Sequence, residues 1–235
     1  MADATPKHLT LKYLPLAWCG LALAIVVLTP LTIEGDIHSA LGAWGISFDT
    51  LAMMLHEVGL LAGTAITLRL LSRRGVRASD LGVGGTIKAS WIAYAIGGFI
   101  LAVFLYPAVG ALAQAVGLSM FWWGDGRFEY RSPLDWCLAV IAAILMAPVI
   151  EELFFRGYLL TALLGRVGSA PTAVCLASLV FMSIHVLMGP GILIYVFLWS
   201  LIPSYLYLRT GSLYPAMLMH ALNNIFAYVV LPALL

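Results

Sequence analysis

The chain has 235 residues, of which 63% are hydrophobic and 10% are charged, and its formal net charge is +1 at pH 7. Soluble domains are closer to half apolar and a quarter charged, so this composition indicates an integral membrane protein. The balanced charge gives no basis for binding nucleic acid, and no such partner is expected. The cysteines lie in apolar segments without CxxC spacing and are expected to be small core residues, at Cys19, Cys137 and Cys175.

The apolar runs predict an all-α, polytopic transmembrane helix bundle. A helix needs about 20 apolar residues to cross about 30 Å of hydrocarbon. The first run is long enough for this and lacks a small-residue cleavage site, so it is expected to be a retained helix rather than a signal peptide. We expect seven spans, or eight with a re-entrant piece, from the runs 13–31, 50–71, 89–116, 134–164, 170–187, 191–208 and 213–234.

Lysine and arginine alternate between the connections in a way that predicts the orientation. By the positive-inside rule the N-terminus is cytoplasmic and, with seven spans, the C-terminus lies outside; in a bacterium the membrane would be the plasma (inner) membrane. The alternate connections hold only Arg127 and Arg131. The cytoplasmic cations are predicted to be Lys7, Lys12, Arg69, Arg73, Arg74, Arg77, Lys88, Arg166 and Arg209.

The second run carries His56 and Glu57 inside an otherwise apolar segment. Two readings stay open: Glu57 extends a polar cavity or carries protons, or it faces a connection or pairs with a group on a neighbouring helix. Gly59 and Gly63 in the same run form a GxxxG pattern, which we interpret as a packing surface inside the chain rather than a dimer contact.

The fourth run contains the most informative residues of the chain, Glu151, Glu152 and Arg156. An ionisable group in a spanning segment costs about 2.5 kcal/mol or more, so such groups are usually paired and functional. Glu152 and Arg156 are four residues apart and are expected to pair on one helical face. Glu151 points about 100° away around the helix. It is therefore a carboxylate without a partner on its own helix, and we predict that it does chemistry.

Two later runs repeat this pattern of polar residues in apolar helices. Phe181 precedes His185 by four residues, and His220 precedes Asn224 by four, which puts each pair on one helical face. A single buried polar residue is often a packing contact between helices. The seven motif residues on three C-terminal helices, six of them polar, favour a functional site: Glu151, Glu152, Arg156, Phe181, His185, His220 and Asn224.

The three motifs, Glu-Glu-x-x-x-Arg, Phe-x-x-x-His and His-x-x-x-Asn, in that order, resemble those of the CPBP family. That family includes the type II CAAX prenyl endopeptidases and bacteriocin-immunity proteins. The resemblance covers about residues 134–234, and before it only the Ser79-Asp80-Leu81-Gly82 loop and the apolar helices support it. We therefore divide the chain into N-terminal transmembrane helices with their loops, 1–133, and a CPBP-like catalytic helix core, 134–235, within one integral membrane unit.

The resemblance implies an intramembrane endopeptidase that hydrolyses a peptide bond of a membrane-associated protein or peptide. A carboxylate in a low-dielectric pocket can act as general base towards water, which suits Glu151, with His185 sharing the water. His220 and Asn224 would donate hydrogen bonds to the oxyanion of the tetrahedral intermediate. The expected supporting residues are Glu152 and Arg156, mainly structural, and Phe181, packed beside the site. The prenyl-processing branch removes a C-terminal tripeptide after a lipidated cysteine, and nothing in these residues shows prenyl specificity.

Zinc is the alternative to metal-free catalysis. Two histidines and a glutamate can hold a catalytic zinc with water as the fourth ligand, and here they would be Glu151, His185 and His220. The HExxH pattern is absent, because His56-Glu57 is followed by Leu60 where the second histidine should stand. We therefore expect no metal cofactor.

A non-enzymatic class competes with the protease: a membrane immunity or scaffold protein that binds a peptide toxin or a partner. Such a binder would not need the full set of Glu151, His185, His220 and Asn224, which favours the enzyme. A proton-coupled transporter is a third class, and the sequence lacks the repeated halves that transporters commonly show.

Overall fold

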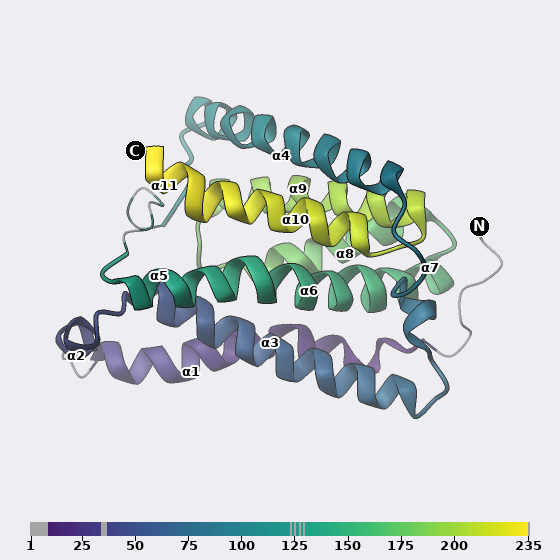
Figure 1. Ribbon diagram of the computed structural model, residues 1–235, viewed down its shortest axis with the longest axis horizontal. Coiled ribbons are helices and arrows are strands. Elements are labelled where there is room, and N and C mark those ends of the chain that lie inside the picture. The colour runs from purple at the N-terminus through teal and green to yellow at the C-terminus, as the bar shows by residue number, and fades with distance from the viewer. Residues whose placement is uncertain are drawn as a thin grey trace.

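The computed structural model describes residues 9–33, 37–122, 124, 126, 128 and 130–234. The prediction of an all-α bundle is confirmed: the described residues form helices and turns, with no strand among them. The helices run back and forth along the long axis of the molecule (Figure 1). Two of the cations used to predict the orientation, Lys7 and Arg127, lie outside the described residues.

Most elements follow one another with short connections, and the longest connection comprises residues 116–132. Most are α-helical; η1 and η2 are 3₁₀ helices, and η3, η4 and η5 are π-helical segments. In chain order they are η1 (Leu11–Trp18), α1 (Cys19–Ile33), α2 (Ile37–Trp44), α3 (Phe48–Ser72), η2 (Ala78–Leu81), α4 (Ala89–Ala115), α5 (Pro133–Val140), η3 (Ile141–Met146), α6 (Ala147–Glu151), η4 (Glu152–Leu160), α7 (Thr161–Val167), α8 (Ala170–Ser183), α9 (Pro190–Thr210), α10 (Tyr214–Ile225), η5 (Phe226–Val230) and α11 (Leu231–Leu234).

Six of the seven predicted runs form helical stretches that are long and apolar enough to cross a membrane. The exception is the run 170–187, whose helix α8 has 14 residues and ends at Ser183. At about 1.5 Å per residue, such a helix is too short to cross about 30 Å of hydrocarbon by itself. The six stretches are Leu11–Thr29, Phe48–Ser72, Ala89–Ala115, Pro133–Val167, Pro190–Thr210 and Tyr214–Leu234.

Capping residues fix where several of these helices start and end. Ser132 caps α5 by accepting the backbone N–H of Asp135 at 3.1 Å, and Ser169 caps α8 in the same way. Between α7 and α8, Gly168 has a φ of +64°. Because glycine adopts a positive φ without steric cost, it ends α7 and lets the chain reverse there.

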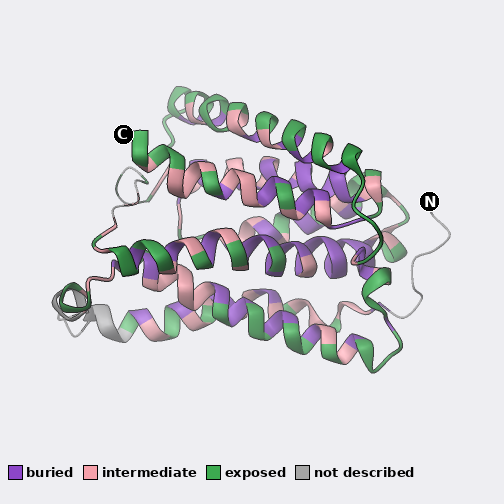
Figure 2. Cartoon of the chain, viewed as in Figure 1, coloured by how far each residue is buried: buried purple, intermediate pink, exposed green. Residues whose placement is uncertain are grey.

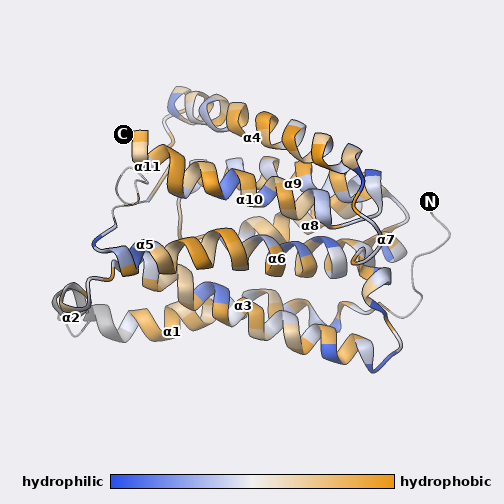
Figure 3. Cartoon of the chain, in the orientation of Figure 1, coloured by the Kyte–Doolittle hydropathy of each residue, from blue (hydrophilic) through white to orange (hydrophobic). Residues whose placement is uncertain are grey.

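Buried residues concentrate along η4 and the neighbouring faces of α9 and α10 (Figure 2). The larger of two apolar core clusters joins N-terminal residues such as Leu60 and Ala95 to Phe154 and Phe181. The outer face of α4 is apolar as well, with Phe104 69% exposed and Leu101 57% exposed. Figure 3 shows this hydrophobic outer surface on α4, as expected for a helix that faces lipid.

Glycines let α3 approach the first helix closely. A Cβ atom on Gly59 would lie 2.7 Å from the carbonyl oxygen of Cys19 and from the Cα of Gly20. One on Gly63 would lie 2.5 Å from the carbonyl oxygen of Leu16. The predicted role of this GxxxG pattern in packing within the chain is therefore confirmed.

The loop that contains Ser79 to Gly82 docks on the C-terminal helices. The backbone N–H of Leu213 donates to Gly82 O at 3.0 Å. A Cβ atom on Gly157 in η4 would lie 3.1 Å from the carbonyl oxygen of Leu81. These contacts connect the N-terminal helices to the segment that carries the first motif.

Candidate active site

The first motif lies where the long stretch Pro133–Val167 departs from α-helical geometry. Residues Ile141–Met146 and Glu152–Leu160 form π-helical segments, with α6 between them. Proline removes a backbone donor and clashes with the carbonyl four residues before it, which fits the break ahead of Pro148. π-Helical turns shift the side chains around the helix and are frequent at functional sites.

Arg156 anchors one side of the site. Its Nη1 donates to Glu152 Oε1 at 3.0 Å, which confirms the predicted pair. Its Nη2 donates to Ser200 Oγ at 2.7 Å and Ser200 O at 3.0 Å, and its Nε donates to Ser204 Oγ at 3.4 Å. Because both members of the pair are buried, these α9 acceptors are needed to satisfy the guanidinium group.

Aromatic rings cover the guanidinium group. The Cζ of Arg156 lies 4.7 Å from the centre of the Phe181 ring and 5.8 Å from that of Trp199. The Phe181 and Trp199 rings stack with centroids 5.9 Å apart. Phe181 therefore packs beside the site as predicted, and the contact is with the charge of Arg156.

His220 connects the two glutamates. Its Nδ1 lies 2.9 Å from Glu152 Oε1, and its Nε2 lies 3.8 Å from Glu151 Oε2. Because an ionised carboxylate only accepts, His220 Nδ1 is the donor in the first contact. The Nε2 atom of a neutral ring is then an acceptor, and it becomes a donor when the ring is protonated.

Asn224 lies one turn beyond His220 on α10, as the spacing predicts. Its Nδ2 donates to Ala143 O in η3 at 2.7 Å, so one of the two amide hydrogens is already bonded. The neighbouring Asn223 is less buried, and its Oδ1 accepts from the Tyr195 hydroxyl at 3.4 Å. The two asparagines therefore have different surroundings, with Asn224 facing the segment that carries the glutamates.

His185 follows α8 in a turn, and its Nδ1 lies 2.9 Å from Phe181 O. Within the described part of the chain, no hydrogen bond or ion pair joins His185 to Glu151. The ring of His185 lies against that of Phe181, with centroids 4.9 Å apart, which places it at the edge of the same cluster.

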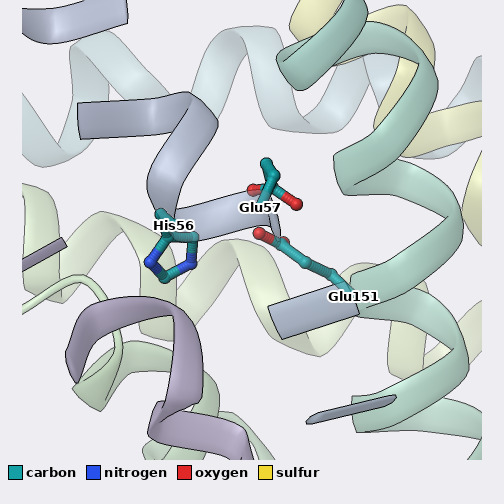
Figure 4. A group of neighbouring side chains, drawn as sticks. All are labelled: His56, Glu57 and Glu151. Carbon is teal, nitrogen blue, oxygen red and sulfur yellow. The ribbon is translucent and has the colours of Figure 1, made fainter. Parts of the chain in front are cut away.

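Glu57 on α3 is a second neighbour of Glu151 from another helix, besides His220 on α10. Figure 4 shows the carboxyl groups of Glu57 and Glu151 facing each other, with the ring of His56 to one side. One ligand atom of each of these three residues lies within 4.8 Å of the others. Glu57 is 3% exposed and Glu151 is 4% exposed. Among the described residues, the neighbours of Glu151 thus come from other helices, Glu57 from α3 and His220 from α10.

This arrangement bears on the zinc alternative. Among the described residues, the group with ligand atoms close enough for one cation is His56, Glu57 and Glu151, and neither His185 nor His220 belongs to it. The ligands of the zinc alternative, Glu151, His185 and His220, are thus not gathered into a three-ligand site. We derive no catalytic step through a metal.

Sequence reasoning missed the residues of α9 that complete the site. Ser200 and Ser204 are polar, four residues apart, and lie in an apolar run next to Trp199. The same signal that singled out His220 and Asn224 could have found them. The buried Nε1 of Trp199 has no hydrogen-bond partner among the described residues.

Comparison with known proteins gives one match. A family model described as type II CAAX prenyl endopeptidase Rce1-like matches residues 133–226, a range that includes Glu151, Arg156, His185, His220 and Asn224. No curated protein and no solved structure matches the chain.

Proposed function

Because residues 133–226 match the model of the Rce1-like family of type II CAAX prenyl endopeptidases, we propose that this multi-pass membrane protein hydrolyses a peptide bond of a membrane-associated substrate. The observation that carries the proposal is the position of Glu151. Its carboxyl group is buried, lies 3.8 Å from His220 Nε2, and is not used by the Arg156 ion pair.

In the proposed reaction Glu151 is the general base. It takes a proton from a water molecule while the water oxygen attacks the carbonyl carbon of the scissile bond. The same proton then passes from Glu151 to the leaving amine as the carbon–nitrogen bond breaks. A water within about 2.8 Å of both Glu151 Oε2 and His220 Nε2 is compatible with their separation of 3.8 Å. His185, at the edge of the cluster, is proposed to help hold this water.

His220 and Asn224 are the proposed oxyanion donors. Asn224 has one amide hydrogen left after its bond to Ala143 O. His220 donates through Nδ1 to Glu152, so its Nε2 donates to the oxyanion only when the ring is protonated. The Glu152 carboxylate stabilises that positive ring, much as a buried carboxylate supports histidine in serine proteases. Glu152 and Arg156 thereby orient His220 without contacting the substrate.

The proposed substrate class is a membrane-bound polypeptide with a lipidated C-terminal cysteine motif. Two observations support it: the description of the matching family and the burial of Glu151 within helices that span the membrane.

We also propose a cytoplasmic N-terminus, since the cation-rich connection after α3 and the end of α7 lie at the same end of the bundle (Figure 1). Protease accessibility of an N-terminal tag in oriented vesicles tests this orientation.

The test uses protein reconstituted in liposomes and a farnesylated peptide that ends in a CAAX sequence. We expect mass spectrometry to detect release of the terminal tripeptide by the wild type and not by Glu151→Gln. The same peptide without the farnesyl group separates lipid recognition from peptide recognition. Equal hydrolysis by wild type and Glu151→Gln would remove Glu151 from the base role. If the wild type and Glu151→Gln both bind the peptide and neither hydrolyses it, the result would favour the non-enzymatic immunity or scaffold class.

We propose that the reaction uses no metal held by Glu151, His185 and His220, because these three residues are not gathered around one position among the described residues. Metal analysis of the purified protein should find no stoichiometric zinc. About one zinc per chain, lost together with activity in His185→Ala, would contradict this.

A further inference from the structure

Glu57 is a buried carboxyl group that the proposed reaction does not yet use. It lies on α3, 3% exposed, and its Oε2 has no hydrogen-bond partner among the described residues. One of its carboxyl oxygens lies within 4.8 Å of a carboxyl oxygen of Glu151. Figure 4 shows the two groups pointing at each other from separate helices. Because burial of an unpaired charge is strongly unfavourable, something in the protein must neutralise or pair this buried carboxyl group.

The charged residues around Glu57 and Glu151 do not neutralise these two carboxyl groups. Arg156 is bonded to Glu152, and the Nδ1 of His220 donates to the same carboxylate. In the described part of the chain, Glu57 forms no ion pair. Glu151 has one ion-pair contact there, between its Oε2 and His220 Nε2 at 3.8 Å. The hydroxyl group of Tyr228 on η5 is near both carboxyl groups and brings no positive charge. Two ionised carboxylates would therefore face each other in an apolar interior.

A shared proton resolves this conflict better than a cation. Two ionised carboxylates can only accept hydrogen bonds, whereas one protonated group donates to the other. A cation would take His56 as its third ligand, since one ligand atom of His56 lies within 4.8 Å of those of Glu57 and Glu151. The His56 ring, however, packs closely on α1, with its Nδ1 3.2 Å from the position of a Cβ atom on Gly20.

We propose that Glu57 carries a proton and donates it in a hydrogen bond to the carboxylate of Glu151. Glu57 is then a positioning residue. Its hydrogen bond keeps Glu151 ionised and orients the carboxylate, so that Glu151 can accept a proton from water. The proton on Glu57 stays on Glu57 during the reaction, and the proton from water travels through Glu151 alone. This inference rests on the proposed role of Glu151 as general base.

The variants Glu57→Gln and Glu57→Met separate this role from simple packing. Glutamine keeps a donor of nearly the same shape, whereas methionine keeps the volume and removes the donor. With the farnesylated CAAX peptide, Glu57→Gln should keep kcat within a few fold of the wild type. Glu57→Met should lower kcat by about 10- to 100-fold, as expected for loss of a hydrogen bond to a charged group, and leave KM nearly unchanged. Thr64→Val, a buried change on the same helix, is the matched control and should leave both constants unchanged.

Infrared spectroscopy tests the proton without any substrate. Difference spectra between H₂O and D₂O should show a protonated carboxyl band that Glu57→Gln removes and Glu151→Gln retains. The reverse pattern would place the proton on Glu151 and overturn the proposal. The proposal would also be overturned if Glu57→Gln were inactive while the wild type is active. Zinc that copurifies with the wild type and is lost in Glu57→Gln would overturn it as well. A wild type without peptidase activity would overturn the proposed function instead, while the infrared pattern would still decide where the proton lies.

Discussion

Glu152 accepts from two donors through one oxygen, Oε1, while its buried Oε2 has no hydrogen-bond partner among the described residues. It accepts from Arg156 Nη1 at 3.0 Å and from His220 Nδ1 at 2.9 Å, and it is fully buried. Glu151 is one residue away and faces a different set of groups. The sequence pattern predicted the Glu152–Arg156 pair because the contact lies within one helix. It did not predict the contact between Glu57 and Glu151, because helix spacing carries no information about which residues of other helices lie opposite.

Breaking the Glu152–Arg156 pair should destabilise the protein. Removal of either partner leaves a buried group without its counter-charge, at about 3–5 kcal/mol. We therefore expect Glu152→Gln and Arg156→Met to lower both the thermal stability and the activity. Glu151→Gln is the control and should be inactive with a nearly unchanged melting temperature. A fully stable but inactive Glu152→Gln would reverse the roles of the two glutamates.

Substitution of Asn224 should lower the rate of peptide hydrolysis and leave the affinity for the substrate unchanged. An oxyanion donor strengthens its bond as negative charge develops, and only such interactions accelerate the chemical step. Loss of one donor typically lowers the rate about 100- to 1,000-fold. Asn224→Ala should therefore lower kcat by this factor with KM nearly unchanged. Asn223→Ala is the neighbouring control, and greater damage from that variant would mean that the wrong face of α10 has been assigned to the site.

Individual elements depart from the expected pattern in two places. The run 170–187 gives a short helix that ends at Ser183, so His185 lies in a turn and not on the helix. The stretch Pro133–Val167 contains two π-helical segments. Hydrophobicity alone could predict neither feature, because turns and π-helical segments in an apolar run have the same composition as the helix around them.

The contact between α1 and α3 should control the position of Glu57. A Cβ atom on Gly59 would lie 2.7 Å from backbone atoms of the first helix, so Gly59→Ala must move the two helices apart. We expect a lower melting temperature and a lower kcat, since Glu57 lies on the same helix two residues earlier. Gly97→Ala on α4 is the control, because a Cβ atom there meets nothing within 4 Å. It should be neutral or stabilising by about 0.5–1 kcal/mol. Equal effects of the two substitutions would contradict this account of α3.

The whole molecule surrounds a polar cluster with an apolar shell. The composition and the lengths of the runs were sufficient to predict this architecture, because a spanning helix must be apolar over a fixed length. The polar residues then indicated the candidate site, because ionisable groups are rarely retained in such helices without a function. The α9 acceptors of Arg156 and the α3 partner of Glu151 required the packing of helices far apart in the sequence.

The central claim is that Glu151 makes this chain a protease within the membrane. Its most direct test needs no assumed substrate: the peptide termini of membrane proteins are compared by mass spectrometry between cells that produce the wild type and cells that produce Glu151→Gln at equal levels. We predict a defined set of new C-termini that occurs only with the wild type. Identical termini in the two cell populations would contradict the claim.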